Sequence, residues 1–242
     1  MASKDFDIEA LADYLHLTPQ QVERLANRGK VPGRKVAGQW RFSPAEIHHW
    51  MEERIGLSEE EELVQVEQAL HRSSGAEGPI PNSIASLLGV EAIALPLEAR
   101  TRGSVISEIA RLAAGTGLLW DPQKMEEAVR AREQLASTAL DSGVALLHPR
   151  RPLSAILAQP LLALGVTSRG IPFGEGGQLT DIFFLICSTD DRGHLQVLAR
   201  LSRLISDPAV LVDIRAATDP AALHDLLAER ERALIVGPEP GP

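Results

Sequence analysis

Residues 132–150 read R-E-Q-L-A-S-T-A-L-D-S-G-V-A-L-L-H-P-R. The apolar run 144–147 is predicted to be a buried strand, and Pro149 prevents its regular continuation just after His148. Arg132 lies sixteen residues before that histidine, near the end of a predicted helix. A histidine that is presented at the end of a strand beside a fixed positive charge has the arrangement that a phosphoryl-accepting histidine requires.

A second histidine has a similar setting. His194 follows T-D-D-R-G at residues 189–193 and is predicted to open a helix that carries Leu195, Leu198, Leu201 and Leu204. The free N–H groups of a helix N-terminus favour an anion and disfavour a charged imidazolium. Neutral imidazole can attack phosphorus, and arginine is the natural bidentate partner of a phosphoryl group. His148, Arg132 and His194 are therefore the candidate catalytic residues, although either histidine taken alone is more often structural.

The region 81–236 alternates two hydrophobic periods, which predicts an α/β fold with strands and helices interleaved. The predicted strands are Ala92–Pro96, Val144–Leu147, Leu161–Ser168, Asp181–Cys187 and Ala233–Val236. The predicted helices are Arg102–Thr116, Asp121–Leu135 (with Met125, Val129 and Leu135 inward), His194–Ile205 and Asp219–Arg230. Cys187 falls within an apolar strand with no nearby base, so a buried structural cysteine is expected. Ser137 and Thr138 are expected to shape their loop or to touch phosphate.

Residues 1–56 predict a small helix-turn-helix domain. Asp7 can cap a first helix, and T-P-Q-Q at residues 18–21 is a capping box that opens a second helix, which Gly29 ends. The segment 36–42 alternates as a hairpin does, with Ala37-Gly38 as its turn. S-P-A-E at residues 43–46 opens a third helix whose inward residues are Ile47, Trp50 and Met51.

The basic residues of this domain are concentrated in one stretch. Residues 24–45 contain six basic residues and no acidic one. In a helix-turn-helix the second helix enters the major groove, which places its glutamines and arginines near base edges and leaves the other basic residues for phosphates. The candidate DNA-binding residues are Gln20, Gln21, Arg24, Arg28, Lys30, Arg34, Lys35 and Arg41. The alternative is a protein-docking module with a solvated basic face.

The two domains are predicted to be joined by an acidic helical linker at residues 57–80. Ser58 can cap a helix that begins with four glutamates, and Leu63, Val66 and Leu70 form a thin apolar stripe. This stripe suits either a solvated linker or a dimer contact. The Gly- and Ser-containing segment 73–79 is the expected domain boundary, and residues 237–242 are the expected disordered tail.

Composition narrows the class of protein. The chain has 242 residues, is 44% hydrophobic and carries a net charge of −9, which argues against general coating of nucleic acid. One cysteine excludes an intrachain disulfide and a multi-cysteine metal site. Neither a signal peptide nor an apolar run of membrane-spanning length is found, so a cytoplasmic protein with no cofactor, metal or membrane association is expected.

The string from Leu11 to Trp50, above all G-K-V-P, G-Q-W-R-F and I-H-H-W, resembles the winged helix-turn-helix modules of excisionases and MerR-type regulators. The resemblance implies DNA binding, with the hairpin as a wing. Binding by one such module is weak and salt-sensitive, which favours a homodimer.

The motifs R-E-x-L-x-S-T, G-V-A-L-L-H-P-R and G-H-L-x-x-L-x-x-L resemble the enzyme IIA domain of the phosphotransferase system, of the fructose/mannitol and nitrogen-regulatory type. The resemblance implies a mixed sheet with helices on both faces. It also implies that His148 accepts phosphate from the histidine phosphocarrier protein, with Arg132 steadying the phosphoryl charge and His194 hydrogen-bonding it. The expected function is a phosphotransferase-linked transcription regulator, in which phosphorylation of the IIA-like domain changes a partner interface.

The sequence departs from the family at the candidate acceptor. The family favours proline before this histidine, where Leu147 stands, and glycine after it, where Pro149 stands. Losing the first proline loosens the backbone that holds His148. The alternative function is therefore a IIA-like sensing or dimerisation module that is no longer phosphorylated, attached to a DNA-binding domain.

Overall fold

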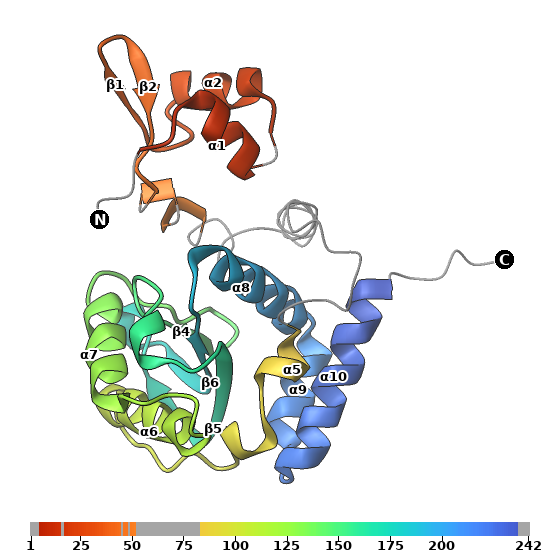
Figure 1. Cartoon of the computed structure of the whole chain (residues 1–242). Helices are drawn as coiled ribbons and strands as arrows, with labels where there is room; N and C mark the ends of the chain where they lie inside the picture. Colours follow the sequence, from red (N-terminus) through yellow and green to blue (C-terminus); the bar gives the residue numbers. More distant parts are fainter. Residues whose placement is uncertain (1–4, 16, 45, 48, 52–82, 237–242) are drawn as a thin grey trace, which may run out of the picture. The chain divides into compact units, whose positions relative to one another are not determined.

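The computed structural model describes residues 5–15, 17–44, 46–47, 49–51 and 83–236. They belong to two compact units, which divide the chain after Pro79 (Figure 1). The predicted linker helix at residues 57–80 and the predicted tail at 237–242 lie outside the described residues, so the proposed segment boundaries stay predictions. Within the described ranges, no helix is both long and apolar enough to cross a membrane.

The first unit begins with two capped helices, α1 (Ile8–Leu15) and α2 (Pro19–Asn27). Asp7 Oδ1 accepts a hydrogen bond from the backbone N–H of Ala10 at 2.9 Å, as the cap prediction required. Thr18 and Gln21 form the predicted capping box, and Gly29 has a φ of 64° just after the helix. A left-handed residue at this position is the usual end of a helix.

A hairpin and a third helix complete this unit. Strands β1 (Arg34–Val36) and β2 (Gln39–Arg41) pair in antiparallel fashion around the predicted Ala37-Gly38 turn. Both turn residues have positive φ, 49° and 78°, as a two-residue hairpin loop of this twist requires. The described residues between 44 and 51 are helical, with Ile47 and Met51 buried and Trp50 partly buried. The buried core also contains Leu11, Ala12, Val22, Ala26, Val31 and Phe42.

The second unit is built on a four-stranded mixed sheet in the order β3-β5-β6-β4. Strand β3 (Ile93–Ala94) is parallel to β5 (Leu161–Pro172), β5 is antiparallel to β6 (Leu179–Cys187), and β6 is parallel to β4 (Val144–Leu147). Both central strands are almost wholly buried over their sheet-forming residues, which explains their nearly continuous apolar sequences.

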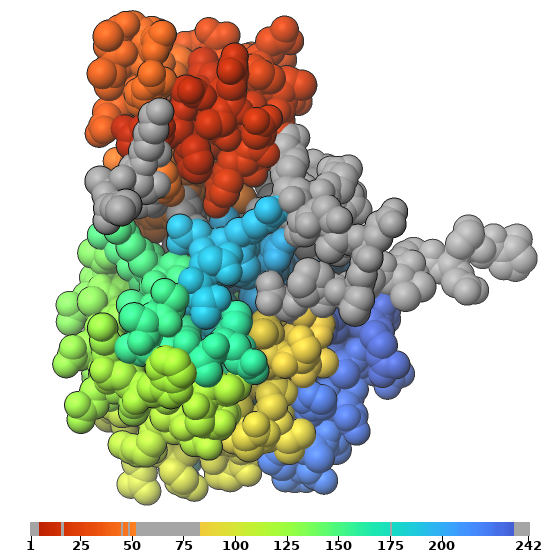
Figure 2. All heavy atoms as spheres, in the orientation of Figure 1, coloured from red at the N-terminus to blue at the C-terminus, as the bar shows by residue number. Residues whose placement is uncertain are grey.

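Helices cover both faces of this sheet, as predicted (Figure 1). Helices α6 (Arg102–Gly115) and α7 (Pro122–Glu133) pack together on one side, and α6 contacts β5 and β6. The other side holds α5 (Ile84–Leu87), α8 (Asp191–Ser206), α9 (Pro208–Ala216) and α10 (Pro220–Val236). Helices α5 and α10 pack against each other although they lie at opposite ends of the unit's sequence, and Figure 2 shows their yellow and blue surfaces side by side.

Three expectations for this unit are wrong. The predicted strand Ala233–Val236 is the last turn of α10, because a short run of β-branched and aliphatic residues also occurs within helices. Leu135 is 63% exposed rather than inward, because α7 ends at Glu133 and the chain then turns away. Helix α8 begins at Asp191, three residues before the predicted start at His194.

Candidate functional site

Parallel pairing of β4 and β6 brings two candidate residues to one edge of the sheet. Leu147 is opposite Leu185, so both strands end at the same edge. His148 directly follows β4, while β6 runs on through Ser188 into α8, which carries His194. The edge at the carboxyl ends of parallel strands is the usual place for a functional site in an α/β fold.

His148 is held in one ring orientation by the backbone. Its Nδ1 lies 2.8 Å from the carbonyl oxygen of Leu146, and the residue is only 3% exposed. A carbonyl oxygen can only accept, so Nδ1 carries the hydrogen and, in the neutral ring, the lone pair is on Nε2. The imidazole ring of His194 lies nearby, with 4.9 Å between ring centroids and 54° between ring planes.

His194 is the fourth residue of α8, so its backbone N–H is engaged. It donates to the carbonyl oxygen of Asp190 at 3.1 Å, and the Oδ1 of Asp190 accepts from Gly193 N at 2.8 Å. Because α8 begins at Asp191, the N–H of His194 is not among the free N–H groups of the helix N-terminus. The imidazole is 2% exposed, and its Nδ1 lies 3.3 Å from the hydroxyl of Ser188.

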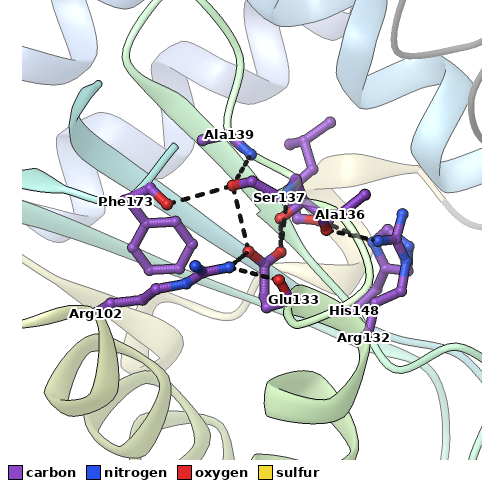
Figure 3. A network of polar contacts seen from close by, with 10 residues as sticks. Arg102, Arg132, Glu133, Ala136, Ser137, Ala139, His148 and Phe173 are labelled. Carbon is purple, nitrogen blue, oxygen red and sulfur yellow. Dashed lines mark hydrogen bonds and ion pairs between the residues drawn. The ribbon is translucent and has the colours of Figure 1, made fainter. Parts of the chain in front are cut away.

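Arg132 is buried at the last turn of α7, with 7% of its surface exposed. Its Nη1 donates to the carbonyl oxygen of Ala136 at 2.9 Å. Its Nε is buried and has no hydrogen-bond partner within the described part of the chain. Figure 3 draws Arg132 and His148 at the same end of a polar network. The guanidinium is thus oriented by one backbone contact and keeps a donor that an incoming anion would satisfy.

The rest of this network contains residues that the sequence analysis did not assign. Glu133, which directly follows Arg132, is 4% exposed and binds Thr138, Ser137 and Arg102 (Figure 3). Ser137 and Thr138 therefore shape their loop, which is one of the two roles expected for them. In the sequence, the signal for Glu133 is its position as the charged residue directly after Arg132 of the motif. Nothing in the sequence links Arg102 to Glu133.

The one cysteine of the chain is a buried residue of the sheet. The side chain of Cys187 is 1% exposed in β6, and burial raises the pKa of its thiol to about 12. This agrees with the prediction of a structural cysteine. No cluster of three or more histidine, cysteine, aspartate or glutamate side chains with metal-binding geometry occurs within the described ranges.

The candidate DNA-binding residues lie on α2, the following loop and the hairpin. All are exposed except Arg41, which is partly buried and donates to Gln39 Oε1 at 2.9 Å. The Oε1 of Gln21 accepts from the N–H of Thr18 at 2.8 Å, so the capping box occupies the amide oxygen that would read adenine. Arg34 pairs with Asp5 at 2.9 Å, and the ammonium of Lys35 lies 5.1 Å from the centre of the Trp40 ring.

Two family models match the chain. Residues 86–230 match the family described as phosphoenolpyruvate-dependent sugar phosphotransferase system, EIIA 2, and residues 6–55 match a helix-turn-helix domain. The chain therefore belongs to the EIIA 2 family and carries an N-terminal helix-turn-helix domain, as the sequence motifs predicted. This combination indicates a regulatory DNA-binding protein.

Relatives with this domain come from several systems. A nitrogen regulatory protein of Bradyrhizobium diazoefficiens is 32% identical over 149 residues, which are 60% of this chain and 94% of that protein. The fructose-specific EIIABC component of Bacillus subtilis is 28% identical over 152 residues, which are 62% of this chain. The matched region spans only 24% of that longer protein.

Solved structures share the fold of the second unit. The nitrogen regulatory protein IIA-Ntr of Neisseria meningitidis matches with a TM-score of 0.53 and 23% identity, over 60% of this chain and 98% of that one. The IIA mannitol domain of Escherichia coli matches with a TM-score of 0.51 and 22% identity, over 57% and 97% of the two chains. A complex of that domain with phosphorylated enzyme IIB has the same fold, with a TM-score of 0.51 and 21% identity, over 59% of this chain and 99% of that one.

Proposed function

We propose that this protein is a phosphotransferase-linked transcription regulator, which accepts a phosphoryl group on His148 and binds DNA through its N-terminal unit. The observation that carries the first part is the hydrogen bond from His148 Nδ1 to the Leu146 carbonyl. It leaves Nε2 as the nucleophile of the neutral ring. Membership of the EIIA 2 family supports the same assignment.

In the proposed step, the donor is a phosphohistidine on a histidine phosphocarrier protein. Nε2 of His148 forms a bond to phosphorus while the donor nitrogen–phosphorus bond breaks, and the donor imidazole keeps that electron pair. The phosphoryl group brings nearly two negative charges. Arg132 would neutralise part of this charge in the transition state, and His194 would donate a hydrogen bond from Nε2.

The proposed DNA contacts follow from the exposed face of α2. Arg24 and Arg28 lie one turn apart on this helix and its cap and are both exposed, so they suit base edges in the major groove. Gln20 is the better-placed glutamine, because the amide oxygen of Gln21 is used in the capping box. Lys30, Arg34, Lys35 and Arg41 would contact phosphates from the loop and the wing.

Phosphorylation is tested by incubating the full chain with labelled phosphoenolpyruvate, enzyme I and the phosphocarrier protein. We expect acid-labile label on the native chain and on His224→Ala, and none on His148→Ala. His224 is the matched control, because it is a histidine of α10 that bonds to the carbonyl oxygen of Ala85. An unlabelled native chain, or equal label on His148→Ala, would overturn the phosphoryl part of the proposal. Label that appears only after Leu147→Pro would instead assign the domain to the alternative, a sensing module that no longer transfers phosphate.

DNA binding is tested separately, by titrating the chain with genomic fragments at two salt concentrations. We expect a complex at low salt that weakens steeply as salt rises, because bound phosphates release counterions. The absence of any complex at low salt would favour the protein-docking alternative for the N-terminal unit.

A further inference from the structure

The buried carboxylate of Glu133 lies at the centre of the network in Figure 3. Its side chain is 2% exposed at the end of α7. A buried carboxylate is costly unless charged and polar partners surround it. Here its Oε2 accepts from Arg102 at 2.7 Å and lies 3.4 Å from the hydroxyl of Ser137. Its Oε1 accepts from the backbone N–H of Thr138 at 3.0 Å and from the hydroxyl of the same residue.

These contacts fasten the loop that orients Arg132. The loop leaves α7 after Glu133, and its carbonyl oxygen at Ala136 accepts from Nη1 of Arg132 at 2.9 Å. Because Glu133 binds Thr138, two residues beyond Ala136, the carboxylate closes the loop over the arginine. The carboxylate is therefore one of the groups that set the loop's path, and with it the direction of the guanidinium.

The same loop also supports the histidine. The carbonyl oxygen of Thr138 accepts from Leu146 N at 3.2 Å, and the carbonyl oxygen of Leu146 bonds to Nδ1 of His148. A continuous set of hydrogen bonds thus leads from Glu133 through Thr138 and Leu146 to the candidate acceptor.

We infer that Glu133 is a positioning residue for the phosphoryl site, which holds Arg132 and His148 in register through the loop 134–139. Arg102 compensates the carboxylate's charge: it also donates to the carbonyl oxygen of Glu133 at 2.7 Å and lies over the Phe173 ring at 5.0 Å. Glu133 acts through the loop and not on the substrate, since its carboxylate is occupied by Thr138, Ser137 and Arg102. This inference rests on the proposed phosphorylation of His148.

The chain offers a matched control on the same helix. Glu126 of α7 also pairs with an arginine and a serine, Arg130 at 2.7 Å and Ser107 at 2.7 Å, but it does not touch the loop 134–139. Glu133→Gln and Glu126→Gln remove the same charge from the same helix. Both variants lose a carboxylate charge on α7, whereas only Glu133→Gln changes a group that binds the loop 134–139.

The experiment measures the rate of phosphoryl transfer at saturating and limiting donor concentrations. For Glu133→Gln we expect kcat to fall on the order of 10- to 100-fold with little change in KM, because a small misplacement of a charge-stabilising group has this effect. Glu126→Gln should keep the native rate. In an Arg132→Ala background, Glu133→Gln should cause almost no further loss, because two residues that act as a unit are not additive. Full additivity in this cycle would overturn the inference.

A second readout does not depend on phosphorylation. Amide hydrogen exchange at Thr138 and Leu146 should be faster in Glu133→Gln, and native-like in Glu126→Gln. Native exchange at both amides in Glu133→Gln would overturn the inference about Glu133, whether or not the native chain is phosphorylated. A native chain that takes no label would overturn only the proposed function. If Glu133→Gln does not fold, Arg102→Ala removes the charge partner from a 40% exposed site and should produce the same effects in weaker form.

Discussion

The imidazole rings of His148 and His194 lie 4.9 Å apart between centroids and are tilted by 54°. The backbone carbonyl of Leu146 holds the first ring through Nδ1, and the Ser188 hydroxyl lies 3.3 Å from Nδ1 of the second. A hydroxyl can donate as well as accept, so Ser188 can leave the hydrogen of a neutral His194 on Nε2. Two such rings would present a lone pair and an N–H donor to the same phosphoryl group.

Ser188→Ala is therefore expected to change the tautomer of His194. Without the hydroxyl, the population with hydrogen on Nδ1 should rise, and phosphoryl transfer to His148 should slow by roughly 10-fold, less than the roughly 100-fold cost of losing a positioned proton donor altogether, because only part of the population changes tautomer. The tautomer is measured from the nitrogen chemical shifts of the imidazole, and the rate from the labelling assay. Ser206→Ala is the control, because Ser206 is exposed at the far end of α8 and bonds to the carbonyl oxygen of Arg203. An unchanged His194 tautomer in Ser188→Ala would contradict this prediction.

The proposed phosphate contacts of the N-terminal unit can be tested through the salt dependence of DNA binding. Lys35 is exposed on the wing beside Trp40, where it suits a phosphate contact. Lys35→Ala should weaken binding to all DNA sequences alike and reduce the salt slope by about 1, whereas Arg24→Ala should cost about 1–3 kcal/mol and relax base preference. Lys124→Ala removes the same charge from the exposed surface of α7 and should leave both measurements unchanged. Equal effects of Lys35→Ala and Lys124→Ala would show that only net charge matters.

Four of the five predicted strands of the second unit occur, because each contains an apolar run, but Leu161–Ser168 is extended to Pro172 in β5 and Ala92–Pro96 is reduced to Ile93–Ala94 in β3. The bounds Val144–Leu147 agree with β4 at both ends, since Gly143 precedes the run and His148-Pro149 follows it. The error at Ala233–Val236 has the opposite cause: the run has strand propensity, but no glycine or proline separates it from the helix that precedes it, and the helix continues through it. Helix α9 was missed although Asp207-Pro208 is a standard cap with proline at the first position.

The site was predictable only in part. His148, Arg132 and His194 carry recognisable motifs, but the proximity of the two histidine rings depends on the sheet order that makes β4 and β6 parallel neighbours. Local patterns do not encode this order, which results from packing across the whole unit. The same reason explains why Arg102, thirty-one residues before Glu133 in sequence, could not be assigned to the network.

Cys187 provides a test of the buried sheet. With a thiol pKa raised to about 12 by burial, only about one thiol in ten thousand is ionised at pH 8, so alkylation by iodoacetamide should be on the order of a thousandfold slower than in urea. The chain has no other cysteine, so the measurement reports this site alone. Because the folded pKa lies above the unfolded value, the contribution of the protonated thiol to stability is fully present below about pH 8.5 and is lost as pH rises toward 12. Rapid alkylation of the folded chain would show that β6 opens.

Glu231 should be a sensitive charged position for the stability of the second unit. Its carboxylate is 3% exposed in α10, lies 3.6 Å from Arg200, and accepts from the backbone N–H groups of Ile84 at 2.7 Å and Ala85 at 3.1 Å. Glu231→Ala would remove the acceptor from two N–H groups at the start of α5 and weaken the contact between α5 and α10. We expect a loss of about 3–5 kcal/mol in the free energy of unfolding, the usual cost of removing one partner of a buried ion pair.

The measurement is urea unfolding followed by circular dichroism. Asp225→Ala is the control on the same helix, because its side chain is 87% exposed and should change stability by less than about 0.5 kcal/mol. Glu231→Gln separates charge from hydrogen bonding: it keeps an oxygen that can accept from Ile84 or Ala85 but loses the attraction to Arg200. The free energy of unfolding of Glu231→Gln should therefore lie between those of the native chain and of Glu231→Ala. If Glu231→Gln were as damaging as Glu231→Ala, the ion pair alone would carry the effect, and the hydrogen bonds to α5 would contribute little.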